Sequence, residues 1–160
     1  MDRINKIINH PDYRLHIEKI ANWEKDREFC RHNTGHFLDV ARIAMVINAQ
    51  ASYGIEKSAI YAAALLHDIG RWQQYENGQD HAWASAQLAP AILKNCDFTE
   101  EESRQIVSAI ATHRESVVKD EKNLNGLLYR ADKLSRPCYF CAQEKNCNWK
   151  NEKKNMELLL

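Results

Sequence analysis

Glycine and proline are scarce in this sequence, with five glycines and three prolines among 160 residues. Sharp chain reversals and β-hairpins depend on such residues, so we expect few of them, and Asn77-Gly78 is the one obvious turn. Neither sign of charge is in excess, because 22 Lys and Arg are matched by 22 Asp and Glu. This balance argues against bulk attraction to nucleic acid or to an anionic membrane.

Long apolar runs and an export signal are also missing. The longest apolar run, from Ala59 to Leu66, is far shorter than the roughly 20 residues that a membrane-spanning helix needs. The N-terminal Met-Asp-Arg-Ile-Asn-Lys lacks the apolar segment of a secretory signal. We therefore expect a cytoplasmic protein, in which the five cysteines are metal ligands or free thiols rather than disulfides.

Apolar residues recur instead at the spacing of α-helices. The pattern predicts an all-α fold, a bundle of about six to seven helices, in a single domain over residues 1–160. The predicted helices are marked by Ile4–Ile8, Tyr13–Trp23, Phe37–Ile47, Ala59–Leu66, a segment that starts at His81, Ile106–Ile110 and Leu124–Leu134.

The helix that includes Ala59–Leu66 is apolar almost all round, so we expect it at the centre of the fold. Ser58 is expected to cap its start, and Gly70 to stop it.

The next two helices have clear start signals. Asp80 is expected to cap the helix that begins at His81, and Pro90 inside that helix predicts a kink or a break into two pieces. Thr99 and Glu102 form a Thr-x-x-Glu capping box for the following helix.

Metal-ligand residue types occur on several of these apolar helices. His67-Asp68 follows the most buried helix, where an ionised carboxylate without a partner is costly. His36 and Asp132 lie on two other apolar helices. A single histidine on an apolar face is usually a core residue, but the combination predicts a metal site. Mixed nitrogen and oxygen ligands suit Mn, Fe, Co or Ni.

Three stretches carry a specific resemblance to a known family: Gly35–Arg42, Ala64–Arg71 and Tyr129–Leu134. Together they resemble the HD superfamily of metal-dependent phosphohydrolases, whose pattern is a His, a His-Asp pair and a distal Asp, and specifically its His-Asp-Ile-Gly (HDIG) subgroup. The resemblance covers residues 30–136, the expected core, and leaves 137–160 as a cysteine-containing C-terminal extension. It implies an HD-domain helical bundle with the metal at its centre.

The resemblance also implies which residues bind metal. A first ion would be held by His36, His67, Asp68 and Asp132. In family members with two ions, Asp68 would bridge them, and His81 and His113 would hold the second ion. The alternative is that His81 and His113 are ordinary helix-end residues.

Three other histidines are less clear from the sequence. His32, four residues before His36, is expected near the substrate or behind the metal ligands. An extra metal ligand and a residue of a solvated turn are the alternatives. His10 and His16 are interpreted as surface residues.

A phosphoester substrate needs positive charge beside the activated water. Arg71, directly after the His-Asp-Ile-Gly turn, and Lys133, next to Asp132, are the candidate phosphate ligands, and with Asp68 they form the predicted catalytic group. Ordinary surface ion pairs are the alternative for both. We expect a small-molecule phosphoester as the substrate, with a nucleotide as the narrower expectation, and the sequence leaves homo-oligomer formation open.

Three aromatic residues near the motif allow two interpretations. Trp72, Tyr75 and Trp83 are placed either to stack on a base or, as is more common, to pack in the core.

Three cysteines in the extension suggest a second metal site. Cys138, Cys141 and Cys147 form a Cys-x-x-Cys pair with a third cysteine further on, a pattern that suits structural Zn. The fourth ligand would be Cys30 or a residue of a partner chain. An iron–sulfur cluster, a redox pair and free thiols are the alternatives.

Two other functions remain open for the whole chain. An HD-type di-iron oxygenase shares these ligands but needs O₂, and a non-catalytic metabolite-binding HD module would show no turnover with metal present.

Overall fold

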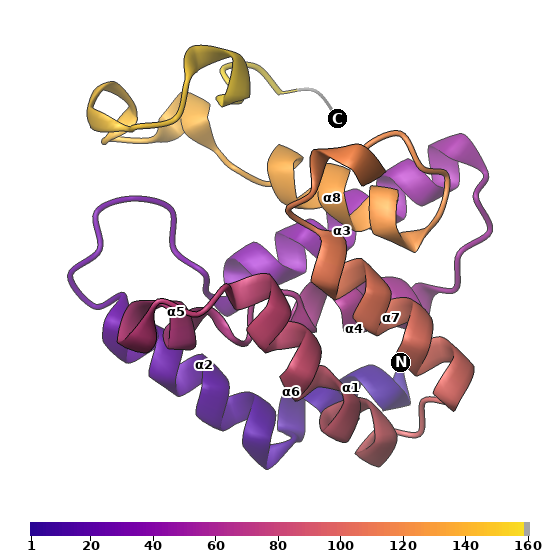
Figure 1. The fold of residues 1–160 in the computed structure, drawn as a ribbon. Helices are drawn as coiled ribbons and strands as arrows, with labels where there is room; N and C mark the ends of the chain where they lie inside the picture. Colours follow the sequence, from indigo (N-terminus) through magenta and orange to yellow (C-terminus); the bar gives the residue numbers. More distant parts are fainter. Residues whose placement is uncertain (159–160) are drawn as a thin grey trace.

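The computed structural model describes residues 1–158, and within them every regular element is helical (Figure 1). The eight α-helices are α1 (Asp2–Asn9), α2 (Pro11–Trp23), α3 (Thr34–Ala51), α4 (Lys57–Leu66), α5 (Arg71–Asn77), α6 (His81–Asn95), α7 (Glu100–Thr112) and α8 (Leu124–Leu134). The predicted all-α fold is confirmed, and all seven predicted helices are present. Leu159 and Leu160, the end of the predicted extension, lie outside the described residues.

Helix α4 is central, as its all-round apolar sequence predicted. It packs against α1, α3, α6, α7 and α8, and every residue from Ala62 to Leu66 is buried. Ile60, Leu65 and Leu66 are at most 1% exposed, and each such side chain contributes about 1.5–3 kcal/mol through its burial. The residues that follow α4 are therefore held in the interior of the molecule.

The caps of α6 and α7 agree with the sequence. The Asp80 carboxylate accepts a hydrogen bond from the Trp83 backbone N–H at 3.0 Å, which fixes the first turn of α6. Thr99 and Glu102 form both hydrogen bonds of the capping box. Pro90, however, lies within one continuous helix, so the predicted break into two pieces is wrong.

Two boundary predictions around α4 are also wrong. The N-cap of α4 is Glu56 rather than Ser58, whose hydroxyl instead accepts a hydrogen bond from Arg3 Nη2 at 2.6 Å. Helix α4 ends at Leu66, and Gly70 is the N-cap of the short helix α5, which the sequence did not predict. No residue of α5 is buried, so it carries no strong apolar pattern.

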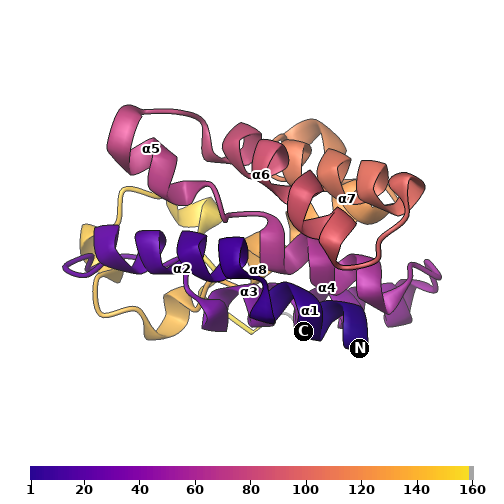
Figure 2. The ribbon, with the colours of Figure 1, turned by 90° about the horizontal axis from the view of Figure 1, so that it is seen from below.

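The chain beyond α8 continues as three short 3₁₀ turns, η2 (Cys138–Phe140), η3 (Glu144–Asn146) and η4 (Asn151–Lys153). This C-terminal segment, yellow in Figure 1, lies at the same end of the bundle as the connection between α2 and α3, and Figure 2 shows the same placement from below. Among the described residues, no helix has the length and apolar character needed to cross a membrane.

Candidate metal centre

Five elements each bring one end to the same point in the bundle. His36 is in the first turn of α3, where the Asn33 side chain caps the helix by accepting a hydrogen bond from the His36 N–H at 3.0 Å. The His67-Asp68 pair lies in the turn directly after α4. The remaining predicted ligands are the first residue of α6, the C-cap of α7 and a last-turn residue of α8, namely His81, His113 and Asp132.

The two oxygens of Asp68 face different histidines. Oδ1 lies 3.2 Å from His81 Nε2 and 3.5 Å from His113 Nε2. Oδ2 lies 3.2 Å from His67 Nε2 and 3.9 Å from His36 Nε2. The carboxylate therefore lies between two sets of imidazoles, which is the arrangement that a bridging carboxylate would have.

Asp132 completes the set that contains His36 and His67. Its Oδ1 lies 3.6 Å from His36 Nε2 and 3.9 Å from His67 Nε2. Potential ligand atoms lie within 4.8 Å of one another in two groups, His36 with His67 and Asp132, and His67 with Asp68 and His113. The structure thus brings all six predicted metal ligands together, and either group could hold a metal ion.

Backbone carbonyls orient two of these imidazoles. The Nδ1 atoms of His67 and His113 lie 2.7 Å from the carbonyl oxygens of Ala64 and Ile110. Because Nδ1–H donates to these carbonyls, the lone pair of each Nε2 faces the centre. The ring of His81 is held by two contacts of its Nδ1, which lies 2.5 Å from Gln74 Oε1 and 2.7 Å from Arg71 Nη1.

Two polar atoms at the centre have no hydrogen-bond partner among the described residues. They are His67 Nε2 and Asp68 Oδ1, in side chains that are 0% and 4% exposed. An unpaired buried polar group of this kind costs about 1–3 kcal/mol, and more when it is charged. A divalent cation would satisfy both atoms at once, so the donor set fits a metal ion.

The protonation states of three of these side chains suit a cation. Burial, reinforced by the charge of His67, lowers the pKa of His36 to about 4. Burial lowers the pKa of His81 to about 3, against the opposing charge of Asp68. Burial alone would raise the pKa of Asp68, but the neighbouring His67 and His113 outweigh it and hold that pKa well below its usual value. Neutral imidazoles and ionised carboxylates are the forms that bind metals. Burial would lower the pKa of the fourth, His67, but the carboxylate of Asp68 outweighs it and raises that pKa, so His67 would release a proton on binding a metal.

Both candidate phosphate ligands line the cavity above the centre, which has a volume of about 590 Å³. Arg71 lies beside His81, and its guanidinium donates to Gln74 Oε1 at 2.8 Å and to the Tyr75 hydroxyl at 3.0 Å. Lys133 forms an ion pair with Asp132. Further basic side chains line the same cavity, namely Arg27, Arg31, Arg114, Arg136 and Lys154.

A buried carboxylate behind the centre was not predicted. Glu24 is 3% exposed and accepts hydrogen bonds from the His32 N–H and the Tyr75 hydroxyl, both at 2.7 Å, and its carboxylate also contacts His32 Nδ1. Burial would raise the pKa of Glu24, but the His32 imidazole and the Tyr75 hydroxyl outweigh it and lower that pKa. Glu24 follows the buried Ile20 by four residues and so continues the buried face of α2. This spacing was the one signal in the sequence that could have indicated a buried carboxylate.

The contacts with Glu24 hold His32 beside the centre. His32 Nε2 is 3.8 Å from Asp68 Oδ2, so His32 borders the centre rather than a solvated turn. The surface interpretation of His16 is wrong, because this residue is 8% exposed and accepts a hydrogen bond from Trp72 Nε1 at 3.2 Å.

The aromatic residues at the cavity are not the expected ones. Trp72 packs partly buried against the core, and neither it nor Tyr75 nor Trp83 lines the cavity. The lining aromatic side chains among the described residues are Phe29, Phe140 and Trp149. The alternative in which Trp72, Tyr75 and Trp83 stack on a base therefore has no support in the geometry, whereas Trp72 fits the favoured interpretation of core packing.

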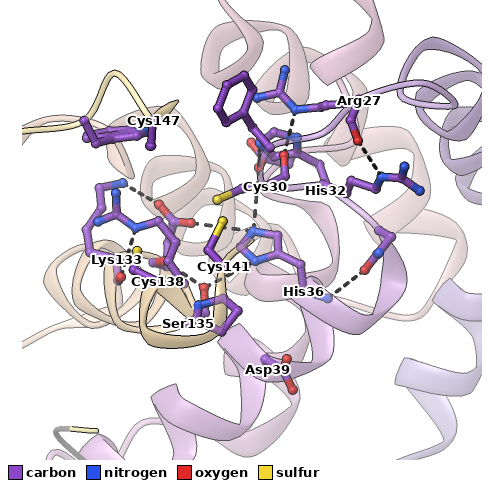
Figure 3. A pocket seen from close by; sticks show the side chains of 18 of the residues that line it. Arg27, Cys30, His32, His36, Asp39, Lys133, Ser135, Cys138, Cys141 and Cys147 are labelled. Carbon is purple, nitrogen blue, oxygen red and sulfur yellow. Dashed lines mark hydrogen bonds and ion pairs between the residues drawn. The ribbon is translucent and has the colours of Figure 1, made fainter. Parts of the chain in front are cut away.

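Four of the five cysteines lie in the wall of the same cavity. Cys30 comes from the connection between α2 and α3, and Cys138, Cys141 and Cys147 from the C-terminal segment (Figure 3). Cys96, the fifth, is buried in the core.

Comparison with known proteins agrees with this arrangement. The model of the HD domain family matches residues 34–136, a range that includes all six converging residues. The chain belongs to the HD domain family. HD domains are generally metal-dependent phosphohydrolases, although some are non-catalytic. Membership of the HDIG subgroup stays a prediction.

Three relatives can be named. An uncharacterized protein of Clostridium beijerinckii is 47% identical over 158 residues, which is 99% of each chain. Ribonuclease Y 1 of Pediococcus pentosaceus is 33% identical over 101 residues, and ribonuclease Y of Lawsonia intracellularis is 36% identical over 100 residues. These matches cover 63% and 62% of this HD-domain chain but only 18% and 17% of the two ribonucleases. No solved structure gives a significant match to the chain.

Proposed function

We propose that this HD protein is a metal-dependent phosphohydrolase that cleaves a small phosphoester. The observation that carries the proposal is the pair of buried, unpartnered atoms, His67 Nε2 and Asp68 Oδ1, of which Asp68 belongs to the lining of a cavity with basic walls. Such atoms favour a cation at the base, and the basic walls favour an anionic ligand above it.

Six side chains would hold the metal, with Asp68 shared between two ions. The first ion would be bound by His36, His67 and Asp132, and the second by His81 and His113. Mn, Fe, Co or Ni suits this mixture of imidazoles and carboxylates. When bound, the metal supplies Lewis-acid chemistry and an activated water near neutral pH.

The other residues of the cavity would bind and orient the substrate. Arg71, held by Gln74 and Tyr75, offers a guanidinium for bidentate contact with phosphate oxygens, and Lys133 offers a point charge beside Asp132. Glu24 fixes His32 at Nδ1, so that His32 Nε2 faces the centre and can hold or donate a proton at the leaving oxygen.

A nucleotide is the substrate class that we favour. Phe29, Phe140 and Trp149 line the cavity above the centre and offer flat faces to a base. Two of the relatives carry the name ribonuclease Y, which supports a nucleotide phosphoester, although the likeness covers less than a fifth of those proteins. We also keep the cytoplasmic location and the single domain over residues 1–160 as predictions.

Phosphate release from an aryl phosphoester and a panel of nucleotides, with Mn²⁺ added, tests the proposal. Wild-type protein should release phosphate only with metal, and Asp68→Asn should abolish release. Asp120→Asn is the matched control, because Asp120 is fully solvated, with a side chain that is 87% exposed. No turnover of any phosphoester by the metal-loaded protein would favour the metabolite-binding module instead.

A second candidate, the di-iron oxygenase, is favoured by one observation. With His32 3.8 Å from Asp68 Oδ2, five imidazoles surround this carboxylate, more than the generic HD pattern supplies. Turnover by iron-loaded protein that stops when O₂ is removed would support this candidate, whereas phosphate release that is unchanged without O₂ supports the hydrolase.

A further inference from the structure

The segment after α8 forms a loop that is closed at its base. Asn155 Nδ2 donates to the carbonyl oxygens of Lys133 at 2.8 Å, Leu134 at 3.2 Å and Arg136 at 3.0 Å. The chain therefore leaves the end of α8, runs through residues 137–154 and returns to the same point.

This loop has no hydrophobic core of its own. None of the residues 137–154 is buried, and its largest apolar side chains face solvent, with Phe140 88% and Trp149 43% exposed. Three short 3₁₀ turns cannot hold an 18-residue loop in one shape without burial. Small coreless segments with a defined shape usually depend on disulfides or on a structural metal.

Cysteine thiols are what this loop contains in place of a core. Cys138 and Cys141 lie at the two ends of turn η2, which the Cys141 N–H closes by donating to the Cys138 carbonyl at 3.1 Å. Cys147 follows turn η3 directly. All three are half-buried free thiols on the side of the loop that faces the cavity. A Cys-x-x-Cys turn commonly supplies two of the four ligands of a structural zinc site, and the third cysteine would supply one more.

The fourth cysteine comes from a segment far away in the sequence. Cys30 lies in the irregular connection between α2 and α3, and Figure 3 shows it facing the cysteines of the C-terminal loop. All four cysteines line the same cavity, so the two segments present their thiols to one shared space.

We propose that Cys30, Cys138, Cys141 and Cys147 bind one Zn²⁺ as a tetrathiolate site, separate from the His/Asp centre. Four thiolates select Zn²⁺ over the harder ions that suit the centre, and they fill the tetrahedral shell of a structural site. Among the described residues, only the His/Asp groups have their ligand atoms within 4.8 Å of one another. No three of the four thiols meet this distance, so zinc binding would bring the three loop cysteines closer to one another as well as to Cys30.

This site would shape the substrate cavity of the protein. The joined segments carry Phe29, Phe140 and Trp149, together with Arg136, all of which line the cavity. The Arg136 guanidinium already lies 4.6 Å from the centre of the Trp149 ring. The zinc would thus fix one wall of the cavity while the metal ligands at its base come from the helical bundle.

Elemental analysis of protein purified without added metal tests the proposal. The wild type is compared with four single variants, Cys30→Ser, Cys138→Ser, Cys141→Ser and Cys147→Ser. We expect about one Zn per chain in the wild type and a loss of this zinc in each of the four variants. Cys96→Ala, at the one cysteine outside the group, should keep it. Because none of the four cysteines is in the core, the helical circular dichroism of all variants should match the wild type.

Co²⁺ substitution gives a second readout that needs no activity. The cobalt protein should show thiolate-to-cobalt charge transfer and the intense visible bands of a tetrahedral site, and both should disappear in Cys147→Ser but persist in Asp68→Asn. That last variant separates this proposal from the proposed function, because it damages only the His/Asp centre.

Three results would overturn the tetrathiolate site. Zinc that stays bound in Cys30→Ser would show that this cysteine is not a ligand. Iron with acid-labile sulfide would show a cluster. Native protein whose thiols all react with a thiol reagent, without releasing zinc, would show free cysteines.

Discussion

Replacing Gly70 with alanine would create a steric clash between α6 and the turn that contains His67 and Asp68. A Cβ atom at Gly70 would lie 2.5 Å from the backbone nitrogen of Ser85 and 2.7 Å from the Cβ of Ala84, both in α6. This is about 1 Å closer than the optimal contact distance. No side-chain rotation can relieve a clash with backbone, so α6 would have to move away from the turn, and the histidine at its start would move with it.

The stability loss should be at the upper end of the range for overpacking, about 3 kcal/mol. For a chain of this length, that corresponds to a fall in Tm of roughly 6–12 °C. Gly70 N–H also donates to the buried Ser85 hydroxyl at 2.9 Å, and displacing α6 would weaken this bond. Because His81 begins α6 and faces Asp68, the affinity for added Mn²⁺ should fall as well.

Thermal unfolding with and without Mn²⁺ measures both effects. Gly54→Ala is the control, because its Cβ would meet no atom within 4 Å, although its φ of +68° makes alanine strained there. Gly54→Ala should lower Tm but leave the increase of Tm by Mn²⁺ unchanged, whereas Gly70→Ala should reduce both. A Gly70→Ala protein with wild-type stability and metal response would refute the reasoning.

Three further predictions concern the rest of the fold and the centre. Thr99→Ala removes half of the capping box and should cost about 1 kcal/mol in chemical denaturation without changing metal content; an unchanged midpoint would contradict this. Glu24→Gln weakens the charged contact with His32 and should cost about 1.5–3 kcal/mol at pH 7. Because the folded state lowers the pKa of Glu24, this contribution is present above the unfolded value, about 4.3, and is lost as the pH falls through the folded value. The stability gap between wild type and variant should therefore narrow in acid, and a gap that widens would contradict the assignment. Mn²⁺ added to metal-depleted protein should raise the wild-type Tm, since a metal at 100 times its Kd stabilises by about 2.7 kcal/mol, and should leave the Tm of Asp68→Asn unchanged.

The sequence predicted those features that depend on local pattern. The all-round apolar segment before His67 indicated a central helix, and Asp80 and Thr99 marked helix starts, because capping needs only residues close in the chain. The six converging residues could be named because the chain resembles a family with a specific motif, although they come from five different elements.

Other features depend on tertiary packing and could not be read from the pattern. Helix α5 buries no residue, so it has no apolar stripe to mark it. Pro90 stays inside one helix because the neighbouring helices fix α6, which a local rule for proline does not include. The partnership of Glu24 with His32 joins the end of α2 to the following connection, and its only signal was an acidic residue on a buried face.

The most direct test of the account is the metal content of the His/Asp centre. Protein purified without added metal should contain about two equivalents of Mn, Fe, Co or Ni per chain by elemental analysis, and Asp68→Asn should lose them while Asp120→Asn keeps them. Wild-type protein that contains none of these metals, and that takes up none when Mn²⁺ is supplied, would contradict the central claim.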